Sequence, residues 1–298
     1  MGKNTSYGTF AQEWVDYAAS KRVADFSEIL ALPINEGRNV VAQADKMAKP
    51  PMNGVVTETR MIDMADGAET EVVIFSPSVK PTGDAPLVLV LHGGGWFLGD
   101  ANSEAIVIAT LVEECGAVVV ASHYRLAPEH PFPTPLNDGY DAFLWALKNS
   151  KSLGADPDKF LVAGSSAGGN LAAALCIKAK MAGMSTKIRG QLLIYPVTCD
   201  YRHLPNKFEL EGYNGGDLPV LPRAAMSKFW GMSMCSPEAT SALWFDLFDS
   251  ADMYNASNSA DPLCSPLLAE DLSGLPPARK NDPSRVAATS PRKLDFSD

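Results

Sequence analysis

Four short, continuously apolar segments constrain the fold of this chain more than any other feature of its sequence. They lie at residues 87–91, 117–121, 160–163 and 192–195. A strand that is apolar on both faces has to be buried on both faces, which is typical of a mostly parallel sheet covered by helices. Predicted helices stand between these strands, at residues 103–115, 136–148 and 167–181. The alternation predicts an α/β fold with a mostly parallel, doubly wound sheet.

Other segments extend this arrangement at both ends. Residues 55–62 and 71–75 are predicted to form two strands around a turn at Asp66-Gly67, a hairpin signal. Two apolar stripes have helical spacing, one made of Phe10, Trp14 and Tyr17 and the other of Met226, Phe229 and Trp230. These stripes either pack into the core or form a helical cap over the C-terminal edge of the sheet, where α/β folds bind ligands.

Length and charge exclude several classes of protein. The 298 residues allow one large domain or two small ones. The chain has 25 Lys and Arg residues against 35 Asp and Glu residues, and the net charge of −10 argues against a nucleic-acid partner. No apolar run reaches the roughly 18 residues of a membrane span, and the first residues lack a secretory core. The five cysteines form no CxxC pair and are expected to be reduced thiols. We therefore expect a cytoplasmic protein without a membrane span, and the sequence leaves its oligomeric state open, a homodimer included.

One motif predicts a nucleophile. Residues 164–168, GSSAG, match G-x-S-x-G and stand between a predicted apolar strand and a predicted helix. In that context the motif forms a strained strand-to-helix turn that exposes its central serine, here Ser166. The glycines avoid the clashes that side chains would cause in so sharp a turn, and the helix N-terminus presents free N–H groups beside the serine. A Gly/Ser-rich loop before a helix is the alternative interpretation.

A glycine-rich segment predicts the matching anion site. HGGGW, at residues 92–96, directly follows the strand at 87–91. Glycines let the backbone come close to a ligand and point N–H groups at it. Two such donors, together with the N–H of Ala167, would stabilise the oxyanion of a tetrahedral intermediate, and each is worth about 3 kcal/mol of activation free energy. The two motifs in this order favour acyl-transfer chemistry.

The chain also resembles a known family. Four segments are similar to the hormone-sensitive-lipase branch of the α/β-hydrolase esterases: HGGGW at 92–96, YRLAPEHPFP at 124–133, GSSAGG at 164–169 and DPLCSPLLAEDLSGLPPA at 261–278. The resemblance runs from about residue 50 to Ala278. It implies an α/β-hydrolase fold with a helical cap, a carboxylic ester as substrate, and no cofactor or metal.

The resemblance also implies roles and boundaries. Ser166 would be the nucleophile, Gly93, Gly94 and Ala167 would donate to the oxyanion, and His92 and Gly95 would support the loop, with His92 not acting as the base. The cap would come from residues 1–50 and from an insertion at about 200–250 within a core spanning 51–278. Four aromatic residues are predicted to line an apolar substrate pocket: Trp96, Phe97, Phe229 and Trp230.

The sequence departs from the family at several points. Ser165 and His123 each stand where the family usually has Asp. After Ala278 the family continues with an apolar strand, whereas residues 279–298 read RKNDPSRVAATSPRKLDFSD and are highly charged. This composition predicts a disordered tail and no buried strand. We therefore expect a chain that is truncated or frame-shifted after Ala278, lacks the last strands of the family and exposes the strand at 192–195 as a sheet edge.

The same departure leaves no triad acid or base identified. Of the four histidines only His203 follows Ser166, and it lies in a polar segment that predicts a loop of the cap. Asp282 has no strand before it. Since removing the histidine of a serine triad costs about six orders of magnitude in turnover, the activity is expected to be impaired. Two alternatives stay open: a catalytically dead, receptor-like ligand-binding protein, and a thioesterase or peptidase on the same fold.

Overall fold

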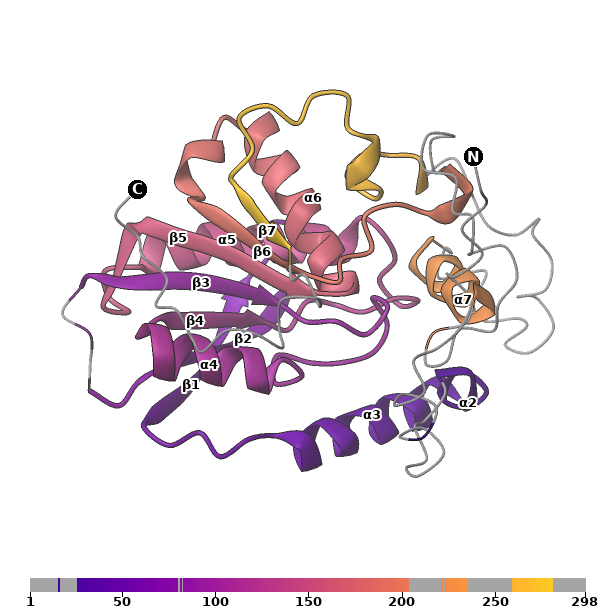
Figure 1. Cartoon of the computed structure of the whole chain (residues 1–298), viewed down its shortest axis with the longest axis horizontal. Coiled ribbons are helices and arrows are strands. Elements are labelled where there is room, and N and C mark those ends of the chain that lie inside the picture. The colour runs from indigo at the N-terminus through magenta and orange to yellow at the C-terminus, as the bar shows by residue number, and fades with distance from the viewer. Residues whose placement is uncertain are drawn as a thin grey trace.

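The computed structural model describes residues 16, 26–79, 81, 83–203, 221, 223–234 and 259–280. Within these ranges one seven-stranded sheet has the order β1-β2-β4-β3-β5-β6-β7 (Figure 1). The strands are β1 (Val55–Asp63), β2 (Glu69–Pro77), β3 (Ala85–Leu91), β4 (Val118–Ser122), β5 (Ala155–Ser165), β6 (Gly190–Ile194) and β7 (Ala278–Lys280). β1 and β2 pair as an antiparallel hairpin, β2 is antiparallel to β4, and the strands from β4 to β7 are parallel.

Helices cover both faces of this sheet, and others lie near the C-terminal ends of its parallel strands (Figure 1). They are α2 (Phe26–Leu30), α3 (Ile34–Ala48), α4 (Ala105–Cys115), α5 (Thr134–Asn149), α6 (Ala167–Met181) and α7 (Arg223–Met234), with short 3-10 turns at Ser185–Lys187, Tyr201–His203 and Pro266–Leu268. α4 packs against β2 and β4, whereas α5 and α6 pack against each other and against β3. The predicted doubly wound, mostly parallel α/β arrangement is confirmed (Figure 1).

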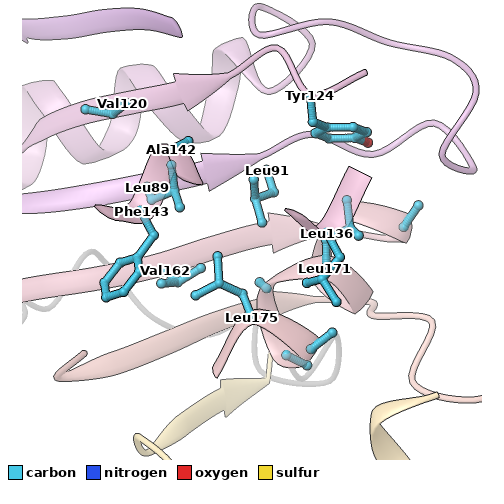
Figure 2. Close-up of a cluster of buried hydrophobic side chains, with 14 of the residues drawn as sticks. Leu89, Leu91, Val120, Tyr124, Leu136, Ala142, Phe143, Val162, Leu171 and Leu175 are labelled. Carbon is cyan, nitrogen blue, oxygen red and sulfur yellow. The ribbon is translucent and has the colours of Figure 1, made fainter. Parts of the chain in front are cut away.

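The residues of β3 show why the central strands are apolar throughout. Leu87, Leu89 and Leu91 point into the larger core cluster, which they share with α5 and α6. Val88 and Val90 point to the opposite face and join the cluster beneath α4. Side chains alternate between the faces of a strand, so both faces of β3 are buried and neither can be polar. Figure 2 shows the first of these clusters, with Leu89, Leu91 and Val162 of the sheet facing Phe143 and Leu175 of the helices.

The last strand corrects an expectation. Residues after Ala278 were predicted to form no strand, and β6 was predicted to be the edge of the sheet. Instead, Ala278–Lys280 form β7, which pairs in parallel with β6, with Gln191 opposite Ala278. Gln191 also reaches the turn before β7, since its N–H donates to the Pro277 carbonyl and its side-chain Nε2 to the Pro276 carbonyl. Backbone pairing needs no apolar side chains, and composition therefore missed a strand. The rest of the predicted tail, 281–298, lies outside the described residues.

Two helices lie beyond the C-terminal ends of the parallel strands (Figure 1). α3 comes from the segment at 1–50 and α7 from the segment at 200–250, both of which were predicted to supply a cap. Arg38 fixes α3 to the body of the protein, because its guanidinium donates to the Phe97 and Ala127 carbonyls, each at 2.9 Å, and to Glu129. The predicted stripe of Phe10, Trp14 and Tyr17 lies outside the described residues.

A buried ion pair holds the segment that follows β4. The carboxylate of Asp138, on α5, is fully buried and accepts hydrogen bonds from the backbone N–H and the guanidinium of Arg125 at 2.7–2.9 Å. Arg125 also pairs with the exposed Asp66 in the β1–β2 turn. One arginine thus joins the hairpin, the end of β4 and α5.

We expect Asp138→Ala to lower the free energy of unfolding by about 3 kcal/mol, because it leaves the Arg125 guanidinium without its buried partner. The measurement is the midpoint of urea unfolding, and Asp158→Ala, at an exposed position, is the control. If the free energy of unfolding changes by less than about 1 kcal/mol, the range of a surface ion pair, then Asp66 and water satisfy the Arg125 guanidinium without Asp138.

Candidate active site

Ser166 occupies the sharp turn between β5 and α6. Its backbone has φ 50° and ψ −116°, a conformation that an L-residue rarely adopts. Two glycines make the turn possible: a Cβ on Gly164 would overlap the Gly168 carbonyl, and a Cβ on Gly168 would overlap the Leu91 carbonyl at the end of β3. Ser166 N–H donates to the Ile194 carbonyl at 2.9 Å, which holds the turn against β6. The predicted strand–turn–helix context of the motif is therefore present.

The glycine loop follows β3 directly. Gly94 has φ 115° and Gly95 φ 61°, both in the region that favours glycine. Space is also restricted, because a Cβ on Gly94 would overlap the Leu98 carbonyl and one on Gly95 would lie 2.8 Å from the Phe229 ring. The Gly94 carbonyl accepts hydrogen bonds from the N–H groups of Phe97 and Leu98, at 3.2 and 2.9 Å. The loop is therefore a fixed turn whose conformation only glycines allow.

The hydrogen bonds of the loop bear on the predicted set of oxyanion donors. Gly93 was expected to donate to the oxyanion, but its N–H already donates to Glu104 Oε1 at 3.0 Å. The N–H groups of the next two residues, Gly94 and Gly95, have no acceptor among the described residues. Ala167 is the first residue of α6, so its N–H has no acceptor within the helix. The amides free to bind an anion here are thus those of Gly94, Gly95 and Ala167.

His92 lies beneath the loop and faces away from solvent. Its Nδ1 lies 2.7 Å from the Gly93 carbonyl, which can only accept, and Nδ1 therefore carries the proton. The ring stacks on Tyr124 with 4.1 Å between centroids, and the Tyr124 hydroxyl donates to the His92 carbonyl at 2.8 Å. Burial lowers the pKa of His92 to about 4. The imidazole is neutral at physiological pH and braces the loop from below.

Ser166 and the three loop glycines line one cavity of about 450 Å³. Its remaining walls come from α3, from α7 and the residue shortly before it, from the segment between β3 and α4, and from the ends of β5 and β6. The residues are Val41, Asp45, Leu98, Gly99, Ser103, Glu104, Ser165, Tyr195, Leu221 and Phe229. Of the four aromatic residues predicted to line the pocket, Phe229 does so. Trp96, Phe97 and Trp230 are buried behind this wall, where Trp96 packs on Trp230 and Phe97 on Phe229, with centroids 4.7 and 5.4 Å apart.

No described histidine is hydrogen-bonded to Ser166. His203 Nε2 lies 2.9 Å from Ser259 Oγ, in the segment between α7 and β7. His123 and His130 line a different, open cavity beside Arg125 and Glu129. Asp282 lies outside the described residues. Within the ranges that the structure covers, Ser166 thus has no triad base. A triad acid acts by orienting that base, so no acid is in place either.

Sequence reasoning missed several cavity residues. Asp45 of α3 accepts a hydrogen bond from Ser103 Oγ at 2.6 Å, and burial raises the pKa of its carboxyl group. Glu104 Oε1 accepts from both Gly93 N–H and Ser165 O–H. One sequence signal could have pointed to Glu104. Ser165 stands where the family usually has Asp, so the elbow lacks a carboxylate that another residue could supply.

Over the described ranges, no group of three or more His, Cys, Asp or Glu side chains is placed to hold a metal ion. In the same part of the chain, no helix combines the length and the apolar composition needed to cross a bilayer.

Comparisons with known proteins agree with this geometry. A family model described as alpha/beta hydrolase fold matches residues 88–279, which hold the glycine loop and the elbow. The chain is 32% identical over 251 residues to esterase LipI of Mycobacterium tuberculosis, covering 83% of this chain and 70% of the relative. The chain belongs to the carboxylesterase-type serine hydrolases of the α/β-hydrolase fold.

Other members of this hydrolase family give the same result. An arylesterase of Saccharolobus solfataricus is 35% identical over 238 residues, which are 78% of this chain and 67% of the relative. The solved structure of EstE1, a thermostable carboxylesterase cloned from a metagenomic library, superposes on this chain with a TM-score of 0.69 at 31% sequence identity. The match covers 84% of this chain and 76% of the EstE1 chain. The expected fold and family are therefore confirmed.

The depressed pKa of His92 predicts a pH dependence of stability. The unfolded histidine titrates near 6.5 and the folded one near 4, so that below pH 6.5 the unfolded state binds a proton that the folded state does not. His92 therefore lowers the free energy of unfolding as the pH falls from about 6.5 to about 4, by roughly 3 kcal/mol in all.

The check is urea unfolding of the parent and of His92→Gln at several pH values in that range. The variant, which carries no titrating ring, should show a smaller decrease in the free energy of unfolding than the parent. Parallel curves for the two proteins would mean that His92 keeps an ordinary pKa in the folded state.

Proposed function

We propose that this chain is a serine esterase that forms an acyl-enzyme on Ser166. One observation carries the proposal: a serine held at φ 50° between β5 and α6 opens into the same cavity as the glycine loop. In this mechanism Ser166 Oγ attacks the ester carbonyl, and the amides of Gly94, Gly95 and Ala167 receive the negative charge of the tetrahedral intermediate. The Ser166 proton passes to water, collapse of the intermediate breaks the ester C–O bond, and the leaving alkoxide takes up a proton from water and departs as the alcohol. A water molecule then hydrolyses the acyl-enzyme, which releases the carboxylic acid and restores the Ser166 hydroxyl.

We infer that the substrate is an apolar carboxylic ester and that its hydrolysis by this chain needs no cofactor. Support comes from the cavity wall, where the side chains of Val41, Leu98, Leu221 and Phe229 supply an apolar surface. The relatives named above are esterases and carboxylesterases, which supports an oxygen ester over a thioester or a peptide. The glycine loop that follows β3 supports the same choice.

We further propose that the activity of this chain is impaired. Ser166 needs a base to accept its proton during attack, and none of the histidines in the described ranges contacts it. The highly charged composition of residues 279–298, where the family continues with an apolar strand, supports the same inference. The alternative is a protein that binds an ester-like ligand without turnover, and the missing base is the observation that favours it.

The nucleophile is tested with a fluorophosphonate probe, with labelling followed by intact mass and mapped by peptide digestion. We expect slow labelling at Ser166, no labelling of Ser166→Ala, and unchanged labelling of Ser152→Ala, an exposed serine outside the cavity. Labelling at other residues only, or none after prolonged incubation with imidazole present, would rule out Ser166 as a nucleophile and leave the ligand-binding alternative.

The missing base is tested by adding one from solution. Imidazole should accelerate both the labelling and the hydrolysis of a nitrophenyl butanoate by the parent chain, because it can take the Ser166 proton. Ser166→Ala measures the direct reaction of imidazole with the ester, which is subtracted. Rapid labelling that does not respond to imidazole would show that the chain supplies its own base and that activity is intact.

A further inference from the structure

We propose that Glu104 is a positioning residue that holds the glycine loop and the nucleophile turn in register. Its Oε1 accepts a hydrogen bond from Gly93 N–H at 3.0 Å and another from the Ser165 hydroxyl. Gly93 belongs to the loop that supplies the oxyanion donors, and Ser165 directly precedes the nucleophile. A single carboxylate oxygen therefore joins the two halves of the site. This inference rests on the proposed function, because it assigns a residue to the same reaction.

The two halves that Glu104 joins are in direct contact. A Cβ on Gly93 would lie 2.9 Å from Ser165 Oγ and 3.2 Å from the Ser165 carbonyl, which shows how closely the loop lies against the turn. Close packing sets the distance between the loop and the turn, but it does not stop one from sliding along the other. Two hydrogen bonds to one oxygen fix both, and bonds to a carboxylate are stronger than bonds between neutral groups.

The position of Glu104 is itself fixed on its other side. Glu104 immediately precedes α4, and its carbonyl accepts the N–H of Ile108 at 2.9 Å. The preceding residue, Ser103, donates to Asp45 of α3 at 2.6 Å and accepts the N–H of Asp100 at 2.9 Å. Glu104 thus transmits the placement of α3 and α4 to the two loops above the sheet.

The geometry also says what Glu104 does not do in the part of the chain described. It forms no ion pair there, and the oxygen that faces the loops is already occupied by two donors. Its effect on the reaction comes through Gly93 and Ser165: Gly93 sets where the amides of Gly94 and Gly95 point, and Ser165 sets where Ser166 stands. To hold the loop and the turn together, residue 104 has to place one acceptor oxygen where Glu104 Oε1 lies, and a glutamine can supply one.

Reaction kinetics with the fluorophosphonate probe test this role. For Glu104→Ala we expect the limiting labelling rate to fall about 10- to 100-fold, because the oxyanion donors are misplaced, while the probe concentration at half-saturation stays unchanged. Glu104→Gln should restore the rate to within about threefold of the parent, since its amide oxygen can accept both bonds. Glu113→Ala, at an exposed position on α4, should label at the same rate as the parent.

A double-mutant cycle separates positioning from simple loss of stability. If Glu104 and Ser165 act through one hydrogen-bonded unit, Glu104→Ala combined with Ser165→Ala should slow labelling no more than the worse single variant. Fully additive effects would overturn the proposal. So would a Glu104→Gln variant as slow as Glu104→Ala, or a rise in the half-saturating concentration without any fall in the limiting rate.

Hydrogen–deuterium exchange decides the proposal even if Ser166 proves unreactive. The Gly93 amide of the folded full-length chain should exchange about tenfold faster or more in Glu104→Ala than in the parent, with Glu104→Gln and Glu113→Ala close to the parent. Equal exchange in Glu104→Ala and the parent would refute the link between Glu104 and the loop. Absence of labelling in every variant, with faster exchange in Glu104→Ala, would count against the esterase function alone.

Discussion

The site of this protein depends on two points at which the backbone leaves no room for a side chain. At Gly168 the start of α6 lies against the Leu91 carbonyl at the end of β3, and at Gly164 the end of β5 lies against the first turn of α6. A single methyl group at either position would force these elements apart. Because they are in contact, the loop that leaves β3 and the serine that precedes α6 open into one cavity. The strained φ of Ser166 is maintained by this packing, which fixes the turn from both sides.

The elements around that contact were largely predictable from the sequence. β3 and β4 carry apolar residues on both faces, and only a strand buried on both sides tolerates that pattern. The bounds of α6, Ala167–Met181, agree with the predicted 167–181, because the glycine motif fixes where the helix begins. The hairpin of β1 and β2 was marked by its Asp-Gly turn. In each case the signal was local: a period, a turn residue or a motif within a few positions.

What the sequence did not reveal depends on contacts between distant residues. β7 is three residues long and is held by backbone pairing with β6, which leaves no trace in side-chain composition. Glu104 lies 61 residues from Ser165, and nothing in the local pattern of either residue indicates the bond between them. The aromatic stripe of α7 correctly predicted an apolar helix, but apolar spacing cannot tell that Phe229 faces the cavity whereas Trp230 faces the core. The loop glycines were recognised as a group, and only the bond to Glu104 distinguishes Gly93 from its two neighbours.

The attachment of α3 has a consequence for how such a protein can diversify. Arg38 anchors this helix to the Glu129 carboxylate and to the backbone carbonyls of Phe97 and Ala127, atoms that every amino acid provides. Val41 and Asp45 follow at three and seven positions and lie over the cavity from the same face of the helix. Mutation can therefore change the size of Val41 while the helix stays docked, whereas Asp45 is tied to Ser103 by a hydrogen bond. Selectivity for a new acyl or alcohol group could evolve at Val41 without disturbing the sheet, the turn or the nucleophile.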